Sequence, residues 1–137
     1  MKICVGLDEW RDLREFPGSP LPPELHNWFE IAKITMRLPD AKAHFIESKV
    51  AKEFSNGVII RIGALGQAYV DDNSFVFIES DDGREQDKET IIHEMLHLLG
   101  AVHTVDNGDL YEAEVRKFKE ATERNLRLLK GGKSDSL

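Results

Sequence analysis

Apolar residues recur every three or four positions between residues 22 and 38, and this spacing predicts an amphipathic helix. Either proline at positions 22 and 23 can begin that helix, because its first turn needs no backbone donor, and Leu38-Pro39 ends it. The buried stripe of the helix is predicted to consist of Leu25, Trp28, Phe29, Ala32 and Met36.

Short runs rich in β-branched and aromatic residues predict strands elsewhere in the chain. The strands are expected at residues 2–7, 58–62, 66–71 and 74–79. Residues 40–55 fit two descriptions. We favour a helix capped by Asp40, with Ile46, Val50 and Phe54 on its inner face, over a strand at residues 44–50.

Two further helices are predicted in the second half of the chain. The first runs from about residue 88 to residue 99 and is capped by Asp87. Apolar residues surround it on most sides, so it should be deeply packed. After a turn at residues 106–108, Asp109 and Glu112 form a capping-box pattern for the last helix.

These elements predict an α+β fold with one domain at residues 1–130 and a disordered polar tail at residues 131–137. A mixed, mostly parallel, twisted sheet with an antiparallel edge strand should pack on the early helix and on the helix at residues 88–99. The C-terminal helix completes the domain. A chain of 137 residues suits one hydrophobic core.

Composition limits the cellular location and the partners that we expect for the protein. No apolar run approaches the roughly 18 to 20 residues of a membrane span, so no membrane partner is expected. The first eight residues do not resemble a secretory signal, which predicts a cytoplasmic protein or a mature form whose leader has been removed. The single cysteine, Cys4, excludes an internal disulfide and a cysteine zinc cluster. The net charge of −7 disfavours nucleic acid as a partner.

Residues 93–103 fit the pattern H-E-x-x-H-x-x-G-x-x-H at every fixed position. Histidines four residues apart share one face of a helix, so His93 and His97 should direct their imidazoles to one point. Glu94, one position further, can reach a water there without being a ligand. Gly100 can adopt a left-handed turn that ends the helix, after which the chain can bring His103 back as a third ligand.

Three neutral imidazoles leave the fourth position of a tetrahedral zinc ion open for water, as in catalytic sites. The sequence therefore predicts one Zn²⁺ ion held by His93, His97 and His103, with Glu94 as the general base.

The eleven-residue motif resembles the zinc-binding signature of the metzincin peptidases. Residues 63–70 and 75–78 also resemble the edge strand and the following strand that precede the active-site helix in that clan. The likeness extends over residues 58–103. It implies a zinc-dependent endopeptidase whose partner is a peptide or protein substrate.

The resemblance implies that the substrate lies extended beside the edge strand. The residues that would contact it there, through their backbone groups, are Gly66, Gln67, Ala68 and Tyr69. Tyr111 is a candidate for contacting the metal or the oxyanion, although its place on the apolar stripe of the last helix favours a core role.

One feature of the clan is missing. Metzincins carry a methionine in a turn beneath the metal, after the third histidine. The methionines of this chain, Met1, Met36 and Met95, all precede His103. Either another residue, such as Leu110, forms the floor of the site, or the last helix packs there differently.

Three alternatives remain open. The bacterial endoribonucleases of ribosomal RNA maturation have a similar H-G-x-x-H-L-x-G-x-D-H segment, but this chain has Glu94 and Val102 where they have glycine and aspartate. A gluzincin-like site would take Glu112 or Glu114 as its third ligand. The zinc ion could also be purely structural, in a binding module without enzymatic activity.

Overall fold

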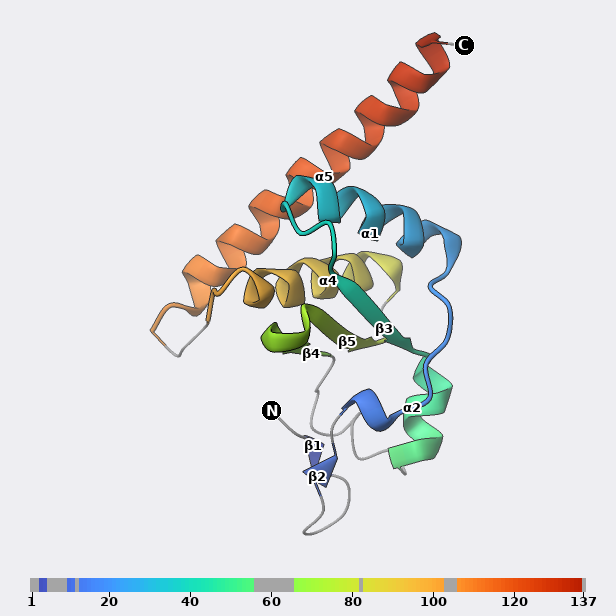
Figure 1. Cartoon of the computed structure of the whole chain (residues 1–137), viewed down its shortest axis with the longest axis vertical. Coiled ribbons are helices and arrows are strands. Elements are labelled where there is room, and N and C mark those ends of the chain that lie inside the picture. The colour runs from blue at the N-terminus through green and yellow to red at the C-terminus, as the bar shows by residue number, and fades with distance from the viewer. Residues whose placement is uncertain are drawn as a thin grey trace.

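The computed structural model describes residues 3–4, 10–11, 13–55, 66–81, 83–102 and 106–136 (Figure 1). Its α-helices are α1 (Pro23–Thr35), α2 (Ser48–Ser55), α4 (Arg84–Leu98) and α5 (Gly108–Ser136), and its 3-10 helices are η1 (Leu13–Glu15) and η2 (Val70–Asp72). Its strands are β1 (Ile3–Cys4), β2 (Trp10–Arg11), β3 (Lys42–Ile46), β4 (Gly66–Tyr69) and β5 (Ser74–Ile78).

The main sheet has three strands in the order β3-β5-β4. The strands β3 and β5 are parallel, with Phe45 opposite Phe77, whereas β4 runs antiparallel to β5, with Gly66 opposite Phe77. This arrangement confirms the predicted α+β fold, with a mixed sheet and an antiparallel edge strand. A separate antiparallel pair joins β1 to β2.

The central strand β5 is buried on both faces of the sheet. Phe75 and Phe77 belong to the larger core, which α1, α4 and α5 cover. Val76 and Ile78 point to the opposite face, where they pack with Leu13 and other residues of a smaller core. A strand covered on both faces needs apolar residues at successive positions, which explains why this run shows little alternation.

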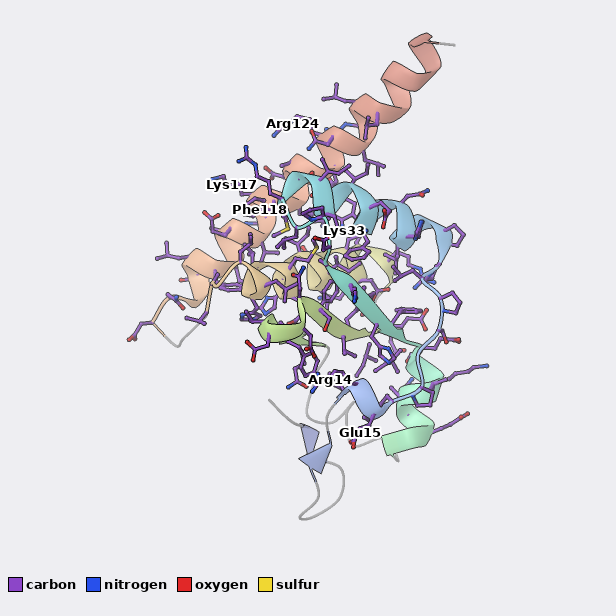
Figure 2. All side chains as sticks on the ribbon, in the orientation of Figure 1. Arg14, Glu15, Lys33, Lys117, Phe118 and Arg124 are labelled. Carbon is purple, nitrogen blue, oxygen red and sulfur yellow. The ribbon has the colours of Figure 1, made fainter. Side chains whose placement is uncertain are left out.

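The helix α4 lies directly against β4 and β5, and it also contacts α1 and α5 (Figure 1). The early helix and the motif-bearing helix therefore pack as predicted. The C-terminal end of α5 extends beyond the rest of the molecule (Figure 1). The exposed Lys117 and Arg124 lie on the middle part of this helix (Figure 2). Among the helices of the described ranges, none combines the length and the apolar character needed to cross a membrane.

The prediction of a single helix over residues 40–55 was wrong. Residues 42–46 form β3, and the helix begins only at Ser48. Pairing with β5 over five residues satisfies the backbone groups on that side of the segment, and Phe45 and Ile46 are buried. Tertiary pairing thus outweighs the local helical pattern. The strand predicted at residues 58–62 lies outside the described residues.

The predicted starts of both later helices also need correction. The helix α4 begins at Arg84, after Gly83 in a left-handed conformation (φ 107°). Asp87 lies inside the helix, where its buried carboxylate accepts a hydrogen bond of 2.7 Å from the backbone N–H of Ser80 and one of 3.2 Å from Arg84. Burial raises the pKa of Asp87. The Asp87 side chain therefore makes a tertiary contact and does not cap the helix.

In α5, Asp109 is already in the first turn, where its negative charge suits the helix dipole, so it is not the predicted capping residue. The helix also continues through Ser136, where a disordered tail was expected from residue 131. Extending an existing helix needs no new nucleus, so α5 can continue past Gly131 and Gly132.

Candidate metal centre

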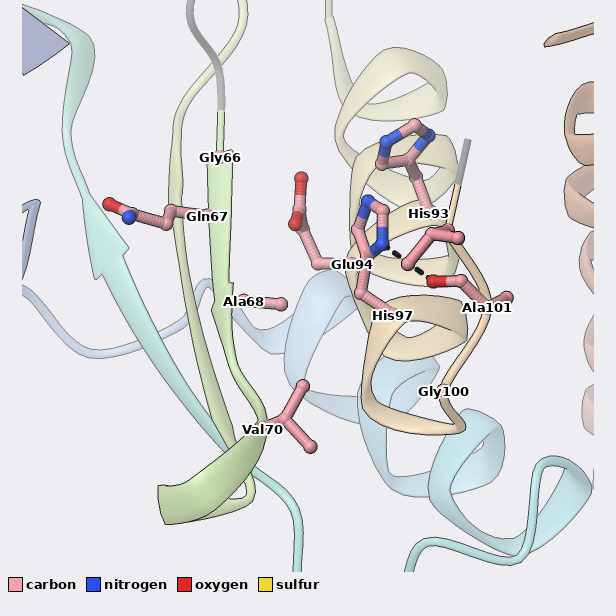
Figure 3. Close-up of a pocket in the computed structure, with 10 residues that line it drawn as sticks. Gly66, Gln67, Ala68, Val70, His93, Glu94, His97, Gly100 and Ala101 are labelled. Atoms are coloured by element: carbon pink, nitrogen blue, oxygen red, sulfur yellow. Dashed lines mark hydrogen bonds between the residues drawn. The ribbon is translucent and has the colours of Figure 1, made fainter. Parts of the chain in front are cut away.

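The two histidines of α4 lie on one side of the helix and line a pocket together with residues of the neighbouring strand β4 (Figure 3). Their ring centroids are 5.1 Å apart and the ring planes make an angle of 76°. Two imidazoles at this separation, on successive turns of one helix, can donate to a single ion. The predicted pairing of His93 with His97 is therefore present in the fold.

A sharp turn fixes the orientation of His97. The backbone N–H of Gly100 donates to the carbonyl of His97 (2.9 Å), and that of Ala101 donates to the carbonyl of Leu96 (3.1 Å). With Gly100 in the left-handed region (φ 96°), these two bonds form a Schellman motif. The helix thus ends at the predicted glycine.

The same turn also sets the tautomer of the His97 ring. Its Nδ1 lies 2.9 Å from the carbonyl oxygen of Ala101 (Figure 3). A carbonyl oxygen only accepts, so Nδ1 carries the proton in the neutral ring and Nε2 carries the lone pair that a metal requires. Sequence reasoning missed this role of Ala101, because only the folded turn brings its carbonyl to the ring.

Glu94 is buried between α4 and β4, with 5% of its surface exposed. A Cβ atom at Gly66 would lie 2.7 Å from the carboxylate oxygen Oε2 of Glu94, so the strand can approach the carboxylate only because residue 66 is glycine. Burial raises the pKa of Glu94 to about 8. A cation in the same pocket would favour the charged form and oppose this shift.

Tyr111, in the first turn of α5, packs against both histidines. Its ring centroid lies 4.8 Å from that of His93 and 5.1 Å from that of His97. Its hydroxyl donates a hydrogen bond of 2.7 Å to the backbone carbonyl of His93. The hydroxyl is thus directed at the helix backbone, which agrees with the predicted core role. Leu110 is 71% exposed, so the suggestion that it forms the floor of the site was wrong.

One of the predicted ligands is absent from the described residues. His103 lies outside them, and within the described ranges no three His, Cys, Asp or Glu side chains are placed to hold one ion. The segment that contains His103 starts from Val102, which lines the same pocket as His93. The Oε1 atom of Glu112 lies 3.9 Å from Nδ1 of His93, and Glu114 is exposed on α5.

A pocket of about 310 Å³ connects these groups. Its walls are Gly66, Gln67, Ala68 and Val70 on one side and His93, Glu94, His97, Gly100, Ala101 and Val102 on the other. This volume falls at the lower end of the range for small-molecule sites. It can therefore admit a short part of a larger substrate beside the imidazoles.

The four predicted substrate-binding residues alternate in direction along β4. Gly66 and Ala68 face the pocket, whereas the Gln67 side chain extends from the opposite side of the strand (Figure 3). The hydroxyl of Tyr69 donates to Oε1 of Gln67 (2.8 Å), and the Arg14 guanidinium lies 3.8 Å from the Tyr69 ring centre. The side chains of Gln67 and Tyr69 therefore support the sheet and do not reach the pocket.

No protein-family model, no curated protein and no solved structure matches this chain.

Proposed function

We propose that this protein is a zinc-dependent endopeptidase. One observation supports the proposal above the others: two imidazoles, one of fixed tautomer, converge beside a buried carboxylate in a single pocket. A helix that only packs in a core gains nothing from three polar groups placed together, since each must find a partner there. Shared ligation and proton transfer would account for all three.

The residues of the chain have separate roles in this proposal. His93, His97 and His103 hold one Zn²⁺ ion, which supplies Lewis acidity and lowers the pKa of a water to about 7. Glu94 accepts the proton of the attacking water and passes it to the departing amine of the peptide. Gly66 leaves the space in which the Glu94 carboxylate lies.

The strand β4 supports a peptide as the substrate. In the described part of the sheet β4 is an edge strand, with β5 on one side only. An extended peptide can pair with such an edge through backbone hydrogen bonds. Ala68 and Gly66, which face the pocket, are small enough to let a second backbone come close.

The proposal can be tested by metal analysis together with proteolysis. Zinc-loaded protein should contain one Zn²⁺ ion per chain and should cleave an unfolded protein. Glu94→Gln should retain the zinc but lose roughly 10²- to 10⁴-fold in cleavage rate, the range for removal of a general base. His26→Ala, on the exposed face of α1, is the matched control and should behave as the wild type.

Three results would contradict the proposal. Protein without bound zinc would remove its basis. Full cleavage by the zinc-loaded Glu94→Gln variant would exclude Glu94 as the base. Cleavage of structured RNA, without cleavage of unfolded protein, would favour the endoribonuclease alternative.

A further inference from the structure

We propose that Tyr111 is a positioning residue of the metal centre. Its ring holds both imidazoles of α4 in place, so the first turn of α5 is part of the site. This inference rests on the proposed metal centre and adds a residue that lies outside the H-E-x-x-H-x-x-G-x-x-H motif.

The contacts of Tyr111 are divided between the two ligands. Its ring is inclined at 53° to the His93 ring and at 37° to the His97 ring, with both centroids within 5.1 Å. A flat, rigid side chain in contact with both imidazoles restricts rotation of each about its χ angles. One residue therefore limits the freedom of both proposed ligands.

The hydroxyl of Tyr111 anchors this arrangement to the backbone. Its bond to the carbonyl of His93 joins α5 to α4 at the residue that carries the first ligand. Tyr111 is 5% exposed, whereas its neighbours Leu110 and Glu112 are exposed. Of these three residues, Tyr111 is the one whose ring is buried against both imidazoles.

The expected effect follows from preorganisation. Residues that orient metal ligands typically contribute 10- to 100-fold to metal affinity, because a mobile ligand loses more freedom on binding. We therefore expect Tyr111→Leu to weaken zinc binding about 10- to 100-fold. Tyr111→Phe keeps the ring and should lose only about threefold, since one hydrogen bond is removed.

Val115 provides the matched control. It lies one turn further along α5 and is buried in the same core, with 2% of its surface exposed. Val115→Ala should lower the free energy of unfolding through lost packing, as Tyr111→Leu also does, but should leave the affinity for zinc unchanged. The comparison separates loss of stability from loss of ligand orientation.

The experiment measures zinc affinity by competition with a chromophoric chelator, and the visible absorption spectrum of the Co²⁺-substituted protein. The inference predicts weaker zinc binding and an altered Co²⁺ spectrum for Tyr111→Leu, with recovery of both in Tyr111→Phe. Should Tyr111→Leu fail to fold, Tyr111→Met provides a flexible filler without the flat ring.

Equal zinc affinities and identical Co²⁺ spectra for Tyr111→Leu and Val115→Ala would overturn the inference while leaving the endopeptidase proposal intact. A wild-type protein that binds no zinc would overturn both. These outcomes are distinguishable because metal binding of the wild type is measured before any variant.

Discussion

The two histidines of α4 are held by different regions of the molecule. The turn at residues 96–101 orients His97 through the carbonyl of Ala101, five residues or fewer from the ligand along the chain. The first turn of α5 contacts His93 through Tyr111 and Glu112, which are almost twenty residues away. His97 is thus held by the local turn as well as by the Tyr111 ring, whereas the contacts described for His93 with α5 come from a distant helix. A site of this kind should respond differently to damage in the two regions.

The largest expected effect concerns the proposed third ligand. It would be His103, which follows the turn, or Glu112, which lies in α5. We expect His103→Ala to weaken zinc binding by more than about a hundredfold, above the loss typical of an outer partner. Glu112→Ala should cost about tenfold or less, because Glu112 is an exposed neighbour of His93. Zinc titrations of both variants provide the measurement. The reverse order would assign the third ligand to α5, as in the gluzincin-like alternative.

A second prediction concerns β4, the strand that forms the other wall of the pocket. Gly66→Ala places a Cβ atom against the Glu94 carboxylate, which must then move. Cleavage of an unfolded protein should fall about a hundredfold, since a displacement of about 1 Å costs that much in catalysis. Zinc affinity should stay near the wild-type value, because no ligand is touched. Ala68→Gly, a small change facing the same pocket, is the control, and equal losses in both variants would contradict the assignment.

A substitution at Gly100 should weaken the turn at residues 96–101 without changing the contacts of α5. Its left-handed conformation disfavours any side chain, so Gly100→Ala should lower the free energy of unfolding by about 1 kcal/mol. Zinc affinity should fall as well, because the carbonyl of Ala101 would shift away from His97. Gly100→Asn should be milder, since asparagine tolerates this conformation. Denaturation in the absence of metal, followed by zinc titration, separates the two effects.

The smallest expected effect concerns the contact that joins the two regions. The side-chain amide of Asn107, just before α5, donates a hydrogen bond of 2.9 Å to the carbonyl of Val102. Asn107→Ala should cost roughly 0.5 to 1.5 kcal/mol of stability and weaken zinc binding only a few-fold. A zinc affinity as low as that of His103→Ala would show that the two regions depend on this single bond.

Sequence reasoning predicted the fold better than it predicted the boundaries of individual elements. The helix α1 and the strands β4 and β5 follow from apolar spacing, which reports the period of the buried face. The strand β3 was missed because its pattern fits a helix as well, and only pairing with β5 decides between them. The cap predicted at Asp87 was wrong for a related reason. An aspartate can serve equally as a helix cap or as a buried hydrogen-bond acceptor, and the sequence does not distinguish the two.

The candidate site was predicted in part. His93, Glu94, His97 and Gly100 stand at fixed intervals in one segment, so their mutual placement follows from helix geometry. The contacts predicted for Gly66, Gln67, Ala68 and Tyr69 with a substrate involve backbone groups and stay a prediction. Alternation along the strand turns Gly66 and Ala68 towards the pocket, which the sequence pattern alone did not show. The roles predicted for His103 and for zinc stay predictions.

The sequence by itself determined the spacing of His93, Glu94 and His97 and the turn that ends their helix, because both depend on residues within one or two helical turns of each other. Only the tertiary structure decided that the Tyr111 ring packs against both imidazoles and that Gly66 makes room for Glu94. These contacts join residues more than ten positions apart, and their distances depend on how helices and strands pack. Local periodicity carries no information about that packing.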